Sequence, residues 1–258
     1  MRQFFLIIFT WIIFSSAYAE DNKLDSSKEV LQHITFYTES FPPFTYENDQ
    51  GELKGYAVDI VEKVFENLGL SKPDIRLKVW DMAYMLTLIS KNSSALFLIS
   101  ETPAREKQFH FSHELTKSKN AIYCNKAIGL KSLTSKDYNK YKFAVEKQDV
   151  NINFLRDIGI PAKNIIVLNS IEIAVEHVAA GRIACMAFSE PVINELSKSS
   201  EVLKDNIILV YNLPETKQSV GFNISIDESV IVLFNEQLEK VLNDQAYIHK
   251  LKAQYGVE

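Results

Sequence analysis

The sequence predicts an α/β protein built as two lobes, and three observations predict it. Strand-like runs alternate with segments of helical spacing, the pattern of a parallel sheet covered by helices. The alternation ends near residue 116 and restarts near residue 142. Residues after 213 have no obvious partners in the second unit, so we expect them to return to the first. Two lobes joined by two crossings place a cleft between them, and clefts between domains favour small ligands.

In the first unit, two helices separate three strands. We expect strands over residues 34–39, 75–80 and 95–100, and helices over 57–68 and 81–90. The apolar positions of the first helix follow helical spacing, and Gly69 is a good helix stop. Between strand and helix, FPPF (residues 41–44) predicts a turn stiffened by proline, and the polar stretch after it predicts a hairpin. The polar residues 20–31 are expected to be loose.

The second unit repeats the pattern. We expect strands over residues 142–147, 165–170 and 183–189, and helices over 149–157 and 171–180. Two further strands follow, over residues 206–215 and 220–227. The last element is an amphipathic helix expected over residues 228–255.

The composition narrows the functional classes. Of the 258 residues 47% are apolar, so the chain can bury a large core and is not disordered. The formal net charge is −5 and no run of Lys and Arg stands out, which argues against nucleic acid as a partner. No G-x-S-x-G, G-x-G-x-x-G or P-loop motif is present. We predict no cofactor and no metal, since the segment holding His110 and His113 looks extended rather than helical.

The N-terminus has the pattern of a signal peptide. A short basic start is followed by an apolar stretch over residues 4–14 and by Ala-x-Ala at residues 17–19. The apolar stretch is well short of the roughly 20 residues that span a bilayer. We therefore expect residues 1–19 to be removed from an exported, soluble protein.

The two cysteines, Cys124 and Cys185, lie in apolar segments and lack C-x-x-C spacing. A free buried cysteine is the ordinary explanation for each. An oxidising compartment would permit a disulfide between them, which stays the alternative.

An arginine follows the buried strand at residues 95–100. In LFLISETPAREKQFHFS (residues 96–112), a Thr-Pro step precedes Arg105 and restricts the backbone that aims it. A guanidinium presents paired donors in a rigid fork that matches a carboxylate. The alternative is a surface salt bridge, for which Glu101 and Glu106 are available.

Several motifs together resemble a known family. They are FPPFTY, GELKGYAVDIVEKVFENLG, VWD, SETPAREKQFHFS, AAGRIA and SEP, in this order. From residue 34 to residue 256 the chain resembles a family 3 extracellular solute-binding protein, the periplasmic component of polar amino acid ABC transporters. The resemblance implies a monomeric, two-lobed periplasmic binding protein of the type II, Venus-flytrap kind, with an ABC permease as partner. Lobe 1 would be residues 34–117 plus 217–258, and lobe 2 residues 118–216.

The resemblance also implies ligand-binding residues in lobe 1. Arg105 matches the arginine that grips the α-carboxylate of the ligand, and Ser100 matches a hydroxyl residue that assists it. Phe41 and Trp80 match aromatic residues that sandwich the ligand side chain, for which an aromatic face suits apolar and cationic groups. Core packing is the alternative for both aromatic residues.

In lobe 2 the resemblance points to the loop that opens a helix at Asp149 and Val150. Free backbone N–H groups there would meet the carboxylate, while Asp149 could equally be a plain helix cap. One position departs from the family, because Ser189 stands where an aspartate usually pairs with the α-ammonium. An unpaired buried ammonium costs several kcal/mol. Either Glu190 or another acid, for which Glu39 is a candidate, supplies the charge, or the ligand is not an ordinary α-amino acid. Glu39 could equally be an exposed loop acid.

The expected function is the non-catalytic capture of an amino acid or related small carboxylate. Two alternatives remain at this point. Some relatives on this scaffold are dehydratases of cyclic carboxylates (cyclohexadienyl dehydratase-like), for which Glu39 or Glu190 could act as acid or base. A solute-sensing receptor module is the other.

Overall fold

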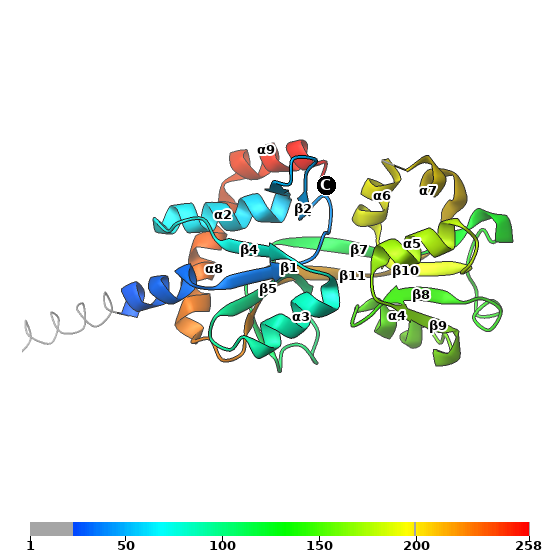
Figure 1. Cartoon of the computed structure of the whole chain (residues 1–258), viewed down its shortest axis with the longest axis horizontal. Helices are drawn as coiled ribbons and strands as arrows, with labels where there is room; N and C mark the ends of the chain where they lie inside the picture. The colour runs from blue at the N-terminus through cyan, green and yellow to red at the C-terminus, as the bar shows by residue number, and fades with distance from the viewer. Residues whose placement is uncertain (1–22, 199, 258) are drawn as a thin grey trace, which may run out of the picture.

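The structure, a computed structural model, describes residues 23–198 and 200–257 and divides into two halves (Figure 1). The predicted signal peptide at residues 1–19 lies outside the described residues. Strands from both halves form one sheet in the order β4-β1-β5-β11-β7-β10-β8-β9, with β6 also paired to β11. Within the described part of the chain, no helix is long and apolar enough to cross a membrane.

The first half holds the parallel strands predicted for it. β1 (Thr35–Thr38) lies between β4 (Asp74–Leu77) and β5 (Ser94–Ser100), parallel to both. Further elements of this half are β6 (Phe109–Phe111) and the helices α2 (Tyr56–Leu68), α3 (Trp80–Ile89), α8 (Glu228–Asn243) and α9 (Gln245–Tyr255). A hairpin of β2 (Tyr46–Glu47) and β3 (Leu53–Lys54) completes it, as the polar stretch predicts.

The second half repeats the arrangement. β8 (Phe143–Glu146) lies between β9 (Ile165–Leu168) and β10 (Cys185–Ser189), parallel to both. Its helices are α4 (Asn151–Asp157), α5 (Ile171–Ala179), α6 (Glu190–Lys198) and α7 (Glu201–Asn206), with 3-10 turns η1 (Lys126–Ile128) and η2 (Ala162–Asn164).

Two long strands run through both halves. β7 (Thr116–Asn125) and β11 (Ile207–Asn223) are antiparallel, and their register runs from Asn125 opposite Ile207 to Thr116 opposite Gln218. β11 then continues beside β5 and β6 of the first half. The sequence predicts two separate strands here. They are one, because the register shift between Leu213 and Thr216 accommodates Pro214 without ending the ladder.

Two sequence predictions are wrong at the ends of the chain. Residues 23–32 are helical rather than loose. The final helix is broken in two at Asp244, whose backbone leaves the helical region and whose carboxylate accepts a hydrogen bond from the Tyr247 N–H. Asp244 thus caps α9, a local side-chain bond that helical spacing does not reveal.

The FPPF turn lies tightly against the start of α2. The Phe41 N–H donates to the Thr45 carbonyl, and the Ala57 N–H donates to the Phe44 carbonyl. Gly55 makes this approach possible, because a Cβ there would lie 2.0 Å from the Phe44 oxygen and its φ is +139°. The sequence GELKGY therefore fixes where the turn sits.

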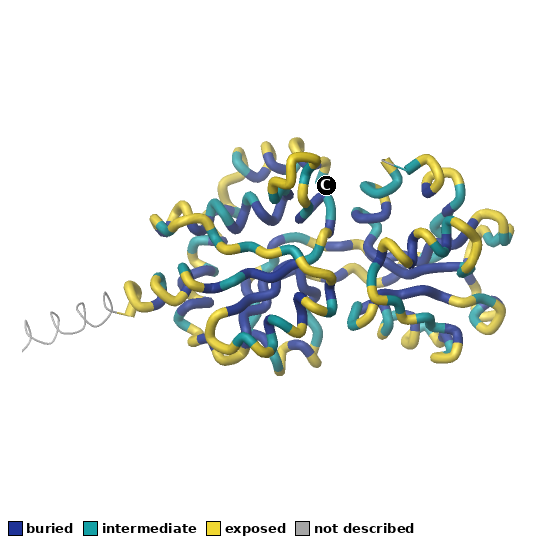
Figure 2. Tube along the Cα trace, in the orientation of Figure 1, coloured by how far each residue is buried: buried dark blue, intermediate teal, exposed yellow. Residues whose placement is uncertain are grey.

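Buried residues follow the strands of both halves (Figure 2). In the first half Phe36 packs edge-on against Phe65, Phe97 and Phe222, each from a different element. Burying one such ring contributes about 1.5–3 kcal/mol. A separate cluster in the second half includes Phe143 and Leu155.

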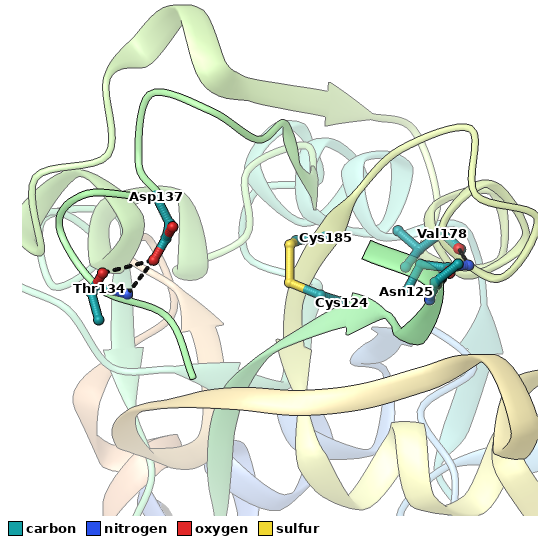
Figure 3. The surroundings of a disulfide bond; sticks show 7 residues. Cys124, Asn125, Thr134, Asp137, Val178 and Cys185 are labelled. Atoms are coloured by element: carbon teal, nitrogen blue, oxygen red, sulfur yellow. Dashed lines mark hydrogen bonds between the residues drawn. A yellow bond between two sulfur atoms is a disulfide. The ribbon is translucent and has the colours of Figure 1, made fainter. Parts of the chain in front are cut away.

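Cys124 and Cys185 form a disulfide (Figure 3). They face each other in register on β7 and β10, which are antiparallel neighbours. Asn125, next along β7, donates to the Val178 carbonyl and ties α5 to the same strand. The sequence left this pairing as an alternative, because spacing alone does not show that two strands are neighbours.

We predict that reducing the Cys124–Cys185 bond lowers the free energy of unfolding by about 4 kcal/mol. The bond joins residues 61 positions apart and so restricts the unfolded chain strongly. Urea unfolding with and without reductant measures the change. A Cys124→Ala/Cys185→Ala variant, which cannot form the bond, should be insensitive to reductant. Equal urea midpoints for the oxidised and reduced protein would contradict the prediction.

Candidate functional site

A small cavity lies between the two halves. Eight of the nine residues predicted for ligand binding line it: Glu39, Phe41, Trp80, Ser100, Arg105, Asp149, Val150 and Ser189. The space open to a water-sized sphere is only ≈ 20 Å³, which is room for about one water molecule. The halves therefore meet around the cavity, and a larger molecule requires them to separate.

Arg105 lines this cavity and is buried, with 7% of its surface exposed. Its backbone N–H donates to the Thr102 carbonyl, so the Thr-Pro step forms the turn that aims it. One guanidinium nitrogen donates to the Ser100 carbonyl at 2.8 Å, and another donates to the Gln148 carbonyl of the second half at 2.9 Å.

These contacts oppose the surface salt bridge as an explanation for Arg105. Glu101 instead accepts a hydrogen bond from Ser219, and Glu106 is exposed. The guanidinium bonds to Ser100 and Gln148 run to carbonyl oxygens. A carboxylate that approached the Gln148 side would replace a neutral acceptor with a charged one, which forms the stronger bond.

Trp80 forms one wall of the cavity at the start of α3. The Arg105 guanidinium lies 5.5 Å from its ring centroid, and the Tyr84 ring lies at 5.8 Å. The two rings therefore hold the arginine by cation–π contacts. The indole nitrogen of Trp80 is buried and has no hydrogen-bond partner among the described residues. It is a donor that a ligand acceptor could satisfy.

Phe41 also lines the cavity. Its ring stacks on Phe44 with centroids 5.8 Å apart, and it meets Phe188 of the second half edge-on at 6.0 Å. Phe41 therefore packs against core residues and also lines the cavity. Core packing and a place at the proposed ligand site are both compatible with this position. Phe44 belongs to the core.

Hydroxyl and amide side chains line the cavity along β7 and β11. The Ser189 and Ser118 hydroxyls are 2.7 Å apart, and the Gln218 amide donates to the Ser100 hydroxyl at 2.9 Å. Sequence reasoning missed Ser118 and Gln218, although both are polar residues at the predicted crossings. Their place at the crossings between the lobes was the feature of the sequence that could have identified them as cavity residues.

Two further residues that line the cavity were missed. Asn120 lies on β7 two positions after Ser118, so strand alternation points both side chains the same way. Leu98 is an extra residue in β5 where the pairing with β11 shifts, and its φ is +61°. Such a bulge re-aims a side chain. Nothing in an apolar run of sequence predicts it.

Glu190 is not brought to this cavity, so the expectation that it serves the ligand there is wrong. It is the first residue of α6, and it lines a groove on another side of the molecule. Ser189 ends β10 with its side chain toward the cavity, and the next residue points elsewhere because the chain turns into a helix. Glu39 is thus the candidate acid that remains.

Asp149 and Val150 stand at the start of α4. The Asp149 carboxylate accepts a hydrogen bond from the Asn151 N–H at 2.6 Å, and Val150 occupies the cap position. Asp149 therefore performs the local capping role while it lines the cavity. Burial raises its pKa, whereas the Asn151 N–H and the Arg105 charge lower it.

The electrostatics of the cavity centre on Glu39. Burial raises the pKa of Glu39 well above its ordinary value. The neighbouring acids Glu146, Asp149 and Glu172 raise it further, because a second negative charge beside any one of them is unfavourable. Arg105 opposes them with its positive charge. Several acids therefore surround Glu39, and among these neighbours only Arg105 carries a positive charge. A cation beside Glu39 would offset the unfavourable interaction between these acids.

Glu146 is the last residue of β8 and is buried. Burial, the Asp149 charge and the Glu172 charge raise its pKa to about 9, against a hydrogen bond from the Ile171 N–H. Its Oε2 atom is buried without a hydrogen-bond partner among the described residues. The side chain is therefore neutral at pH 7, since an unpaired buried carboxylate is costly.

The sequence matches the profile of the bacterial extracellular solute-binding proteins, family 3, over residues 34–255. The chain belongs to this family. It is 21% identical over 242 residues to a probable amino-acid ABC transporter-binding protein of Haemophilus influenzae. That match covers 92% of this chain and 90% of the relative.

Solved structures share the fold of this family 3 protein. A histidine kinase sensor domain with similarity to periplasmic binding proteins superposes with a TM-score of 0.78 at 17% identity, over 88% of this chain and 97% of that one. The arginine-, lysine-, histidine-binding protein ArtJ of Geobacillus stearothermophilus superposes with a TM-score of 0.74 at 18% sequence identity. That match covers 86% of this chain and 95% of ArtJ. The two-lobed fold of periplasmic binding proteins, which the sequence predicts, is confirmed.

We predict that Glu146→Gln flattens the dependence of stability on pH. The folded pKa of about 9 lies above the unfolded value of about 4.3, so the folded state holds an extra proton between them. The contribution of Glu146 to the free energy of unfolding is fully present below the unfolded pKa. Between the two pKa values it falls by roughly 1.4 kcal/mol for each unit that the pH rises. Urea unfolding of both proteins from pH 5 to pH 8 measures the slopes. Identical slopes would refute the assignment.

Proposed function

We propose that this family 3 protein binds an amino acid or a closely related small carboxylate in the cavity between its halves, as the periplasmic component of an ABC transporter. The observation that carries this proposal is the buried Arg105 guanidinium, held by Ser100 and Trp80 and aimed across the boundary between the halves. Glu39 lines the same cavity and supplies the charge for an ammonium group. Ser189, in place of the usual aspartate, offers a hydroxyl.

The proposed lobes follow the two crossings. Lobe 1 comprises residues 34–117 and 217–258, and lobe 2 comprises residues 118–216. In support, β7 and β11 pair through this region, with Ser118 opposite Thr216 and Lys117 opposite Lys217. A two-stranded connection bends more easily than a packed core, so the hinge of the proposed opening lies there.

Closure around the ligand is the proposed signal to the permease. Contacts between the halves surround the cavity: the Arg105 bond to Gln148, and the ion pair of Lys147 with Asp81 at 2.9 Å. With ≈ 20 Å³ of space, the cavity admits an amino acid only when the halves part. A ligand touching both halves then favours closure, as differential binding requires.

The protein is proposed to act as a monomer and to release its ligand unchanged. Pairing of a carboxylate with Arg105 and of an ammonium with Glu39 binds a zwitterion by its two charges, which requires no bond to break. Recovery of a chemically altered compound after incubation would favour the dehydratase alternative instead.

We predict that a thermal-shift screen of amino acids, short peptides and cyclic carboxylates raises the melting temperature with at least one amino acid. A ligand that binds the folded state alone stabilises it by about 2.7 kcal/mol at a hundred times its Kd. Chromatography of the mixture then establishes whether the compound is unchanged. A screen with no stabilising amino acid would refute the proposed function.

We predict that Arg105→Ala weakens binding of the stabilising amino acid about tenfold or more. Each charged hydrogen bond lost is worth roughly 1.5–3 kcal/mol. Titration calorimetry measures the Kd, and Arg182→Ala is the matched control because Arg182 is an exposed arginine paired with Glu176. Unchanged affinity in Arg105→Ala would remove Arg105 as the carboxylate anchor.

We predict that Glu39→Gln weakens binding and removes its pH dependence. Because the pKa of Glu39 is raised, an ammonium must compete with a proton for the carboxylate, and affinity in the wild type should increase as pH rises from 5 to 8. Calorimetry across this range measures both effects. The exposed Glu106 provides the control variant Glu106→Gln. A Glu39→Gln variant with wild-type affinity at every pH would disprove the role.

A further inference from the structure

A second and larger depression lies on the opposite face of the hinge strands. This groove, which we call the rear groove, has room for ≈ 650 Å³, against ≈ 20 Å³ in the ligand cavity. Strand alternation separates the two spaces. Ser118 and Asn120 of β7 line the cavity, whereas Lys117 and Lys119 of the same strand line the rear groove.

The walls of the rear groove come from different halves. On one side stand the start of α2 and the C-terminal residues, including Tyr56, Lys252 and Val257. On the other side stands α6, with Asn194 and Lys198. α9 and α6 lie on the same side of the molecule, above the sheet as drawn in Figure 1, and α3 and α4 lie on the other.

The hinge strands therefore separate two spaces whose widths change in opposite directions when the halves rotate. If the halves rotate about β7 and β11 so that the cavity widens, the walls on the opposite face must approach each other. The cavity is narrow and the rear groove is wide in this arrangement. We propose that the rear groove sets the balance between open and closed forms, so that bulk added to its walls blocks opening and strengthens ligand binding at the distant cavity. This inference rests on the proposed function in that it assumes a ligand held between the halves.

The coupling has a definite sign. A wedge between α6 and the C-terminal residues raises the free energy of the open form and leaves the cavity residues untouched. Less free energy is then needed to close the halves on binding, and the apparent affinity increases. A substitution at this distance from the cavity would weaken binding or leave it unchanged if it acted only through local damage.

Asn194→Trp and Lys198→Trp test the proposal, because both positions line the groove and both are exposed on α6. Val202→Trp is the control, since Val202 is 60% exposed on α7 of the same half and lies outside the groove. Small-angle X-ray scattering without added amino acid measures opening, and calorimetry with L-arginine as the probe measures affinity. Circular dichroism checks that each variant is folded.

The groove variants should have a smaller radius of gyration than the wild type and bind L-arginine about fivefold more tightly or better, while Val202→Trp matches the wild type. Groove variants that match the wild type in both measurements, or that bind more weakly, overturn the proposal. A wild-type chain that binds no screened compound contradicts the proposed function instead. The scattering comparison then still decides whether the groove controls opening.

Discussion

β7 and β11 pair from Asn125 opposite Ile207 to Thr116 opposite Gln218, across the boundary between the two halves. Each half completes its sheet on this strand pair: β5 and β6 attach to one end of β11, and β10 attaches to β7 through a ladder that includes the Cys124–Cys185 disulfide. The same strands carry cavity side chains on one face and groove side chains on the other. A single antiparallel pairing thus joins the two halves at the proposed hinge and separates the cavity from the rear groove.

The charges around the cavity explain why its residues are arranged as they are. Arg105 is buried between two aromatic rings and two carbonyl oxygens, so its positive charge is held without an ion pair to Glu101 or Glu106. Glu39 and Asp149 are half-buried in the same cavity, and their loss of solvent raises the pKa of both carboxyl groups. A zwitterion would bring a carboxylate to the arginine and an ammonium to Glu39, which removes the cost of burying each charge alone.

Much of this site could be predicted from the sequence, because its parts follow local rules. Alternating strands and helices indicate the fold, and the Thr-Pro turn aims Arg105. The failures have physical causes. Glu190 differs from Ser189 by one position, and the turn from strand into helix sends it to the other face. The bulge at Leu98 and the break at Asp244 depend on backbone contacts that spacing does not encode.

A crystal structure of the protein with the amino acid that stabilises it most tests the central claim directly. We expect the α-carboxylate on the Arg105 guanidinium in place of the Gln148 carbonyl, and the ammonium beside Glu39. An amino acid bound elsewhere, with Arg105 still donating to Ser100 and Gln148, would contradict the account.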